Sequence, residues 1–254
     1  MQPGVITQRP VDQHQRRTRS PHQGAVAFSA FGALLALLSV AAFWKPYFSH
    51  PARVTEAYVH THVFFVGLWM SALVAQPLLI RRGRYDLHRA IGKASFALAP
   101  LVGLSALLLA HSRFSRMDDA TLARSLFTLY LPLMAITGFL ASYGLAVAFR
   151  RRRAAHAAFM LGTALALIDP IVVRLVFFYT SAGEVHWIYD AIGIALVGTT
   201  LTILIVLSRH VPRVRAAFAV LLLLFGGLSA GWLTLARTEA WATFARWFVD
   251  LPLT

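Results

Sequence analysis

The chain has 254 residues, of which 58% are hydrophobic and only 13% are charged, whereas ordinary domains are about 45–50% apolar and about 25% charged. This composition excludes a disordered chain and a water-soluble domain, and the absence of cysteine excludes disulfides, thiolate metal sites and iron–sulfur clusters. The formal net charge of +14 is typical of basic loops that flank membrane spans.

Seven segments are long and apolar enough to cross a bilayer, which takes about 20 residues in a helix. Their apolar runs are continuous rather than alternating, which favours helices over a barrel. In chain order the predicted spans are Ala25–Trp44, His60–Ile80, Ile91–Ala110, Leu126–Phe149, Ala155–Phe178, Trp187–Ser208 and Ala216–Ala236. The sequence therefore predicts an all-α, seven-transmembrane-helix bundle over residues 25–236, between tails at 1–24 and 237–254.

Basic residues predict the orientation of this bundle. Sixteen of the 24 Lys and Arg fall on one side, in the N-terminal tail and in the loops at 81–93, 150–153 and 209–215. The positive-inside rule places that side in the cytoplasm, so we expect a cytoplasmic N-terminus and a C-terminus outside, in a bacterial cytoplasmic (inner) membrane. The basic loops should attract anionic lipids. No segment outside the spans is typical of a nucleic-acid-binding fold, so no nucleic-acid partner is expected.

Proline and glycine predict the ends of several helices. Gly83 suits the residue that ends the second helix in a left-handed conformation. Pro51 can open that helix, which would then run from about 51 to 80. Pro132 and Pro170 lie inside spans, where they favour kinks.

Two further features concern packing and the C-terminal tail. The small-xxx-small pair Gly227 and Gly231 suits close helix packing, either within one chain or between two copies in a homodimer. The segment 238–251 is amphipathic, and its apolar face carries Trp241, Phe244, Ala245 and Phe248. We expect an interfacial helix on the outer surface.

Carboxylate–imidazole pairs with i, i+4 spacing fall on the outer side. Glu56 and His60 form one pair, and His186 and Asp190 form the other. Together they predict a Zn²⁺, Cu²⁺ or Fe site, to which His50 or His111 could add a nitrogen. The alternative is that these interfacial histidines have no ligand. His62 points to nearly the opposite side of its helix from His60, so both can ligate one ion only if the helix unwinds.

Asp169 and Arg174 lie inside the fifth predicted span. An ionisable residue at that depth costs about 2.5–3.5 kcal/mol on insertion, so neither is expected to face lipid. They are predicted to form a proton relay, the site of an anionic head group, or a structural ion pair.

The inner side carries a second group of histidines. His88 and Gly92 are four residues apart, so a small residue leaves space beside the imidazole for a flat macrocycle such as haem. His156 opens the fifth span at the same depth. Haem b held by both histidines is therefore a candidate, and contact of these residues with lipid head groups is the alternative.

The motif His60-Thr61-His62 followed by Leu87-His88-Arg89-Ala90-Ile91-Gly92 resembles an uncharacterised group of bacterial polytopic membrane proteins. It is also similar to the cytochrome b561-like bundles. The resemblance covers residues 60–110, with an echo around His156, and it implies a helical bundle with haem-ligating histidines. A b561-type core has four helices that each supply a buried histidine, whereas the span 126–149 here has none.

Three functions follow from these patterns. The first is haem or metal binding through His60, His62, His88, His156 and His186 for membrane electron transfer. The second is a transporter or a lipid- or quinone-binding protein that uses Asp169 and Arg174. The third is an accessory membrane protein without a cofactor. No phosphate-binding loop, nucleophile elbow or HExxH motif is present in the sequence.

Overall fold

The computed structural model describes residues 21–180 and 186–254, with side chains for 24–180 and 191–254. All regular secondary structure in these residues is helical. The α-helices are α1 (Pro21–Ala42), α2 (Ala57–Arg81), α3 (Tyr85–Ser115), α4 (Asp119–Ser125), α5 (Tyr130–Ala148), α6 (Arg153–Leu165), α7 (Ile168–Tyr179), α8 (His186–Leu207), α9 (Pro212–Leu233) and α10 (Glu239–Val249). Short turns are η1 (Trp44–Phe48, a π-helix) and the 3-10 helices η2 (Pro51–Arg53), η3 (Leu126–Leu129) and η5 (Leu235–Arg237).

Six helical segments of the described chain are long and apolar enough to cross a membrane. They are Gly24–Ala42, Ala57–Arg81, Tyr85–Ser115, Asp119–Ala148, Arg153–Tyr179 and Pro212–Arg237, and the shorter apolar helix Ala191–Leu207 accompanies them. Large apolar side chains point outward along the bundle: Leu223 is 77% exposed and Leu37 is 69% exposed. Such a surface is stable in lipid and not in water. The fold is therefore that of a multi-pass helical membrane protein.

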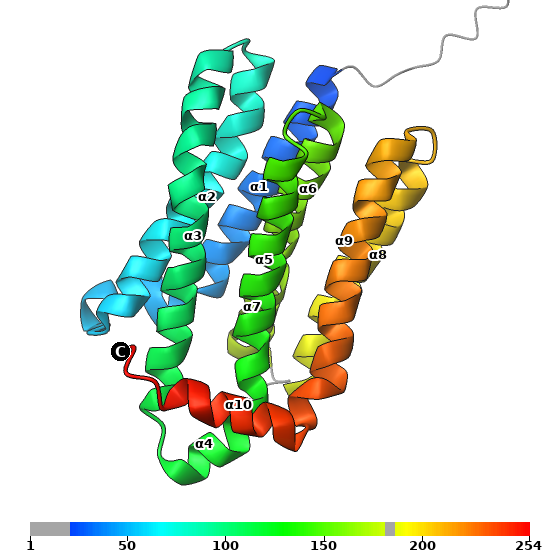
Figure 1. The fold of residues 1–254 in the computed structure, drawn as a ribbon. Coiled ribbons are helices and arrows are strands. Elements are labelled where there is room, and N and C mark those ends of the chain that lie inside the picture. The colour runs from blue at the N-terminus through cyan, green and yellow to red at the C-terminus, as the bar shows by residue number, and fades with distance from the viewer. Residues whose placement is uncertain (1–20, 181–185) are drawn as a thin grey trace, which may run out of the picture.

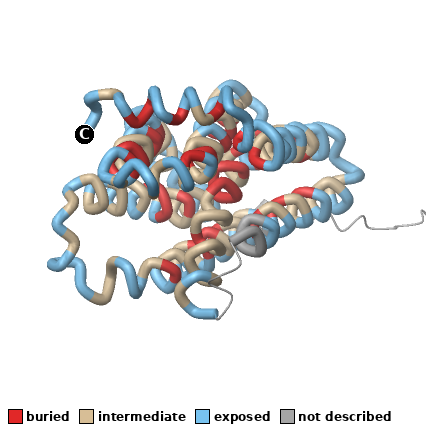
Figure 2. Tube along the Cα trace, turned by 90° about the horizontal axis from the view of Figure 1, so that it is seen from below, coloured by how far each residue is buried: buried red, intermediate tan, exposed pale blue. Residues whose placement is uncertain are grey.

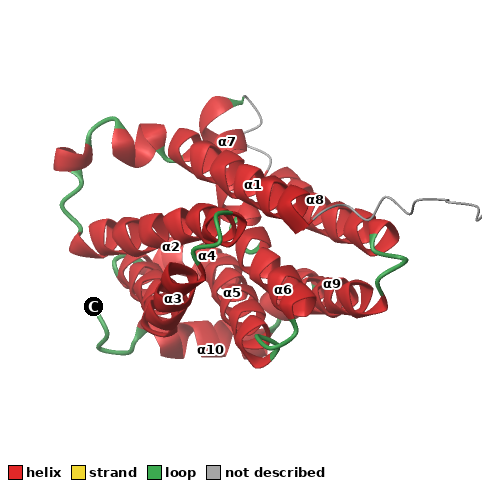
Figure 3. Ribbon diagram, turned by 90° about the horizontal axis from the view of Figure 1, so that it is seen from above, coloured by secondary structure: helices red, strands yellow, loops and turns green. Residues whose placement is uncertain are grey.

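The long helices run alongside one another, and α10 crosses one end of them (Figure 1). We call this the α10 end. The opposite end, here the basic-loop end, carries the start of α1 and the loops 82–84, 149–152 and 208–211. Buried residues gather where the helices face each other (Figure 2). In the view from above, α5 lies between α3 and α6 (Figure 3), and both helices pack against it.

The predicted ends of the second helix are partly confirmed. Gly83 has a φ of 70° and lies just beyond the C-cap Arg82, as predicted. The prediction that Pro51 opens this helix is wrong, because Pro51 begins the separate turn η2 and α2 starts at Ala57. Extended backbone at Val54 and Glu56 separates the two elements.

Proline interrupts the helix path where α6 gives way to α7. The predicted fifth span consists of α6 and α7, and Pro170 lies in the first turn of α7. A proline in the first turn of a helix removes no intrahelical hydrogen bond. Pro132 occupies the same kind of position in α5, directly after η3. Both prolines therefore mark helix starts within a span.

The predicted amphipathic segment forms α10. The Thr238 hydroxyl caps it by accepting from the Trp241 N–H at 3.2 Å. Trp241 is buried and its Nε1 donates to the Leu126 carbonyl at 3.0 Å. The apolar face of α10 thus packs on the end of the bundle. At the same end, hydrogen bonds from the side chain and backbone of Thr121 lower the pKa of the α4 cap Asp118.

Candidate functional site

His60 and Glu56 engage different partners at the α10 end. The Nε2 of His60 donates to the Val54 carbonyl at 2.8 Å, because a carbonyl only accepts. The Nδ1 of His60 therefore accepts the hydroxyl proton of Tyr47 at 2.9 Å. Glu56 forms an ion pair with Arg116 at 3.1 Å. With both nitrogens occupied, His60 fastens the segment before α2 to that helix and offers no lone pair to a metal.

The other members of the predicted outer metal site are described only in part. The side chains of His186 and Asp190 lie outside the described residues, so their metal-binding role stays a prediction. His50 is exposed and contacts the neighbouring Ser49 at 3.1 Å. Within the part of the chain that is described, no group of three or more His, Cys, Asp or Glu could hold a metal ion.

His62 connects α2 to α3. Its Nδ1 lies 3.1 Å from the hydroxyl of Ser105, which itself donates to the Val102 carbonyl at 3.0 Å. Since that hydroxyl has one proton, it must accept from His62 Nδ1. The Nε2 of the neutral ring is left with a lone pair. His60 and His62 thus differ in role, although they are two residues apart.

The side chains of Arg174 and Asp169 extend from α7 toward different helices. Arg174 donates to the Pro170 carbonyl at 3.4 Å, and its Cζ lies 4.9 Å from the centre of the Phe43 ring. Asp169 borders Gly193 of α8, where an added Cβ would collide with the carboxylate.

Charged groups on two helices act on Arg174. Arg113 of α3 acts on its guanidinium as a like charge. Asp169 supplies the opposing attraction. An arginine inside a span costs up to about 2.5–3.5 kcal/mol on insertion, and the cost is largest at the centre of the bilayer. Arg174 and Asp169 therefore form the first candidate site.

A second group of polar side chains lies at the basic-loop end. Gln76 of α2 donates from Nε2 to the His88 carbonyl at 3.2 Å. His88 of α3 interacts electrostatically with His156 of α6. His156 donates from Nδ1 to the Ala146 carbonyl at 2.9 Å, so its Nε2 is unprotonated in the neutral ring. In the described residues, His88 Nδ1 and Gln76 Oε1 are buried and have no hydrogen-bond partner.

An aromatic cluster continues from this group toward the middle of the bundle. Ser95, two turns after His88, contacts the Tyr143 hydroxyl at 2.9 Å. The Tyr143 ring lies 5.5 Å from the ring of Trp69, which lies 4.9 Å from that of Phe139. Trp69 is 2% exposed, so these rings form a rigid core between α2, α3 and α5.

His111 occupies a third environment, beneath α10. It is 1% exposed, its Nδ1 lies 2.7 Å from the Thr254 hydroxyl, and its ring meets Phe248 edge to face. The Nε2 of His111 and the hydroxyl of Ser112 are buried with no hydrogen-bond partner in the described residues. His60, His50 and Glu56 do not join it as ligands, so this position fits the packing of α3 against α10.

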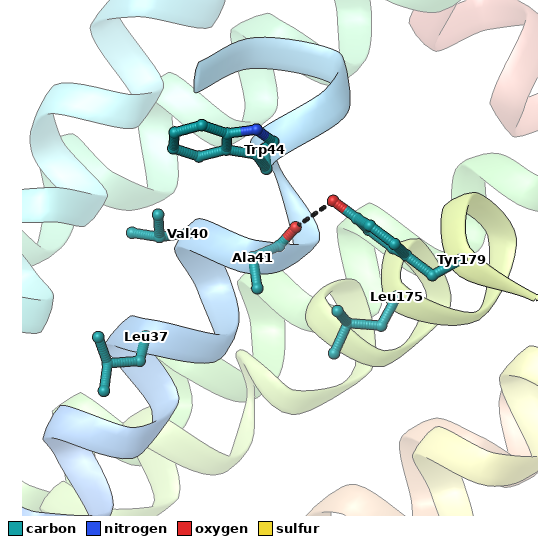
Figure 4. A pocket seen from close by; sticks show the side chains of 6 residues that line it. All are labelled: Leu37, Val40, Ala41, Trp44, Leu175 and Tyr179. Carbon is teal, nitrogen blue, oxygen red and sulfur yellow. Dashed lines mark hydrogen bonds between the residues drawn. The ribbon is translucent and has the colours of Figure 1, made fainter. Parts of the chain in front are cut away.

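An apolar groove of about 460 Å³ lies between α1 and α7 (Figure 4). Its lining residues are Leu37, Val40, Ala41, Trp44, Leu175 and Tyr179. The Tyr179 hydroxyl is already used, because it donates to the Ala41 carbonyl at 2.9 Å. The groove is therefore apolar, and the one side-chain hydroxyl in its lining is engaged in this bond.

Comparison with known proteins finds no match, whether to a family model, to a curated protein or to a solved structure. The sequence resemblance to b561-like bundles accordingly stays a prediction.

Sequence reasoning missed Ser105 and Arg113, and it gave Gln76 no role. Ser105 and Arg113 follow His62 by more than 40 residues, and no local spacing connects them to it. Gln76 carried a weak signal, since the turn at Gly83 folds α2 and α3 into a hairpin that brings Gln76 toward His88. A polar residue in an otherwise apolar span is the general sign of such sites.

Proposed function

We propose that the chain crosses the bacterial cytoplasmic membrane seven times, with α8 as the span that accompanies the six long ones. The N-terminus then lies in the cytoplasm and α10 lies outside. The basic loops support this orientation, because they gather at one end of the bundle (Figure 1) and positive loops stay inside.

Within this topology we propose that the protein binds haem b through His88 and His156 and serves in membrane electron transfer. The proposal depends on the placement of two histidines: His88 of α3 and His156 of α6 lie at the basic-loop end, on helices that both pack on α5. The described residues near them supply no third histidine, cysteine or carboxylate for a metal cluster. A bare ion needs three or four protein ligands, whereas haem would need only His88 and His156 from the protein to hold its iron.

The ring nitrogens of both histidines suit axial ligation. The bond from His156 Nδ1 to the Ala146 carbonyl fixes the ring and directs the lone pair to Nε2, which is the usual arrangement behind a metal-bound histidine. His88 keeps a buried Nδ1 without a partner in the described residues. Gln76 anchors the backbone of His88 and so holds the ligand helix in place.

Space and charge around the pair also suit haem. Nothing lies within 4 Å of a Cβ added at Gly92, one turn after His88, so that side of the imidazole is open. The helices α3 and α6 each pack on α5, which keeps the two histidine-bearing helices apart. Arginines 150–152 and Arg84 lie in loops at this end, and Arg153 begins α6. These side chains could pair with the carboxylates of haem. When bound there, haem supplies a one-electron couple.

Replacing either histidine tests the proposal. We expect His88→Ala and His156→Ala to lose the Soret band of the purified protein, because each removes one axial nitrogen. His210→Ala is the matched control, since His210 is exposed at the same end and contacts only Arg209 among the described residues. Haem content per chain is measured after expression with added haem precursor. Equal haem in all variants, or a stoichiometric non-haem metal in place of haem, contradicts the proposal.

A further inference from the structure

We propose that the apolar groove between α1 and α7 binds an anionic phospholipid, with one acyl chain in the groove and the phosphate at Lys45. The groove lies beside the last turns of α1, away from the basic-loop end where that helix starts (Figure 4). Neither α1 nor α7 carries His88 or His156, so this proposal and that of haem binding can fail independently.

The groove is elongated along the two helices, as an acyl chain requires. Leu37, Val40 and Trp44 line it on one side with i, i+3, i+7 spacing, so they follow one helix face. Seven residues at a rise of about 1.5 Å give this side a length of about 10 Å. Leu175 and Tyr179 of α7, spaced i, i+4, line the other side (Figure 4). Because Trp44 is 53% exposed, the groove is open to the surrounding lipid.

Lys45 places a positive charge at one end of this groove. Its Nζ lies 4.5 Å from the centre of the Tyr179 ring, which lines the groove. That ring is held in turn by the 2.9 Å hydrogen bond from its hydroxyl to the Ala41 carbonyl. Lys45 follows the end of an apolar span, where a long basic side chain reaches the level of the head groups. The ammonium is therefore placed to meet the phosphate of a lipid whose chain fills the groove.

Lys45 can bind a ligand although it already contacts the end of α7. Its Nζ donates to the Phe178 carbonyl at 2.7 Å, and last-turn carbonyls have no partner within their own helix. An ammonium has three N–H donors, of which this carbonyl and the Tyr179 ring occupy at most two. A helix C-terminus supplies only about half a negative charge, so the site stays positive. It therefore favours a head group with a net negative charge over a zwitterionic one.

Binding of phosphatidylglycerol to the full chain tests the proposal. The protein is purified in detergent without lipid and titrated in parallel with phosphatidylglycerol, with phosphatidylcholine of the same acyl chains, and with ubiquinone. Native mass spectrometry counts the ligand molecules that each chain retains. We expect saturable retention of phosphatidylglycerol, about fivefold tighter than that of phosphatidylcholine. Equal retention of the two phospholipids, or preferential retention of the quinone, overturns the proposal.

Variants of Lys45 test the charge at the end of the groove. We expect Lys45→Gln to weaken phosphatidylglycerol binding about fivefold or more, because it removes the ammonium. Lys45→Arg keeps a positive charge and should retain most of the affinity. Arg53→Gln is the matched control, since Arg53 is exposed in η2, does not line the groove and changes the net charge equally. Equal binding by Lys45→Gln and Arg53→Gln overturns the site.

A second pair of variants tests the groove while leaving Lys45 in place. Val40→Trp puts a larger side chain into the groove, so we expect it to displace the acyl chain and lower the retention of phosphatidylglycerol. Leu38→Trp is the matched control, because Leu38 is exposed on the same helix and does not line the groove. Equal retention by Val40→Trp and Leu38→Trp would show that the lipid is held by charge alone, which also overturns the site.

Discussion

Trp69→Ala is expected to produce the largest loss of stability of any single change in the bundle. Trp69 is 2% exposed and packs edge-on against Phe139 and Tyr143. Removing the indole leaves a cavity that these rings cannot fill. Lipid is as apolar as the protein interior, so this change has no large hydrophobic cost. We therefore expect only the loss of packing, which lowers the free energy of unfolding by about 2–3 kcal/mol. The free energy of unfolding in a detergent titration measures it.

Trp69→Phe is the control for this prediction. The Nε1 of Trp69 is buried without a hydrogen-bond partner in the described residues. Replacement by phenylalanine therefore reduces the side-chain volume without removing a hydrogen bond. We expect it to cost clearly less than alanine. Equal stability of the wild type and Trp69→Ala would show that this cluster does not hold α2 against α5.

Gly231→Ala is expected to have the second largest effect, by overpacking. A Cβ at Gly231 would collide with the hydroxyl of Tyr130 and lie 2.9 Å from its Cζ. The ring cannot move freely, because its hydroxyl donates to the Leu228 carbonyl at 3.0 Å and Trp241 lies 5.0 Å away. Overpacked core positions lose about 1–3 kcal/mol. The loss should appear as a lower unfolding temperature.

Gly227→Ala provides a matched control one turn earlier on α9. Nothing lies within 4 Å of a Cβ added there, and alanine favours a helix over glycine by up to about 1 kcal/mol. We therefore expect Gly227→Ala to be neutral or stabilising. A similar loss for both variants would mean that glycine is needed for a contact between copies of the chain, rather than for the fit of Tyr130.

Hydropathy predicted the helical membrane bundle because insertion depends on the summed apolarity of about 20 residues. These residues are consecutive in the chain, so the signal is contained in a single segment. The end of α2 at Gly83 was predicted for the same reason, because a left-handed residue that ends a helix depends on the local sequence. The prediction that Pro51 opens α2 was wrong because a proline suits the start of any helical turn. In the structure the Val54 carbonyl between η2 and α2 accepts a hydrogen bond from His60.

The candidate sites were only partly predictable, because they are assembled from distant segments. Spacing correctly placed Glu56 and His60 one turn apart, yet the partners that occupy them, Arg116 and Tyr47, come from other elements. His62 likewise finds its partner Ser105 on another helix, α3. Helix periodicity carries no information about which helices become neighbours.

The most direct test of haem-mediated electron transfer is a reduced-minus-oxidised absorption spectrum of the purified wild-type protein. Axial ligation by His88 and His156 predicts a Soret band that shifts on reduction, together with the sharp visible bands of iron with two histidine ligands. A colourless protein after expression with added haem precursor, or a spectrum that dithionite leaves unchanged, would contradict it.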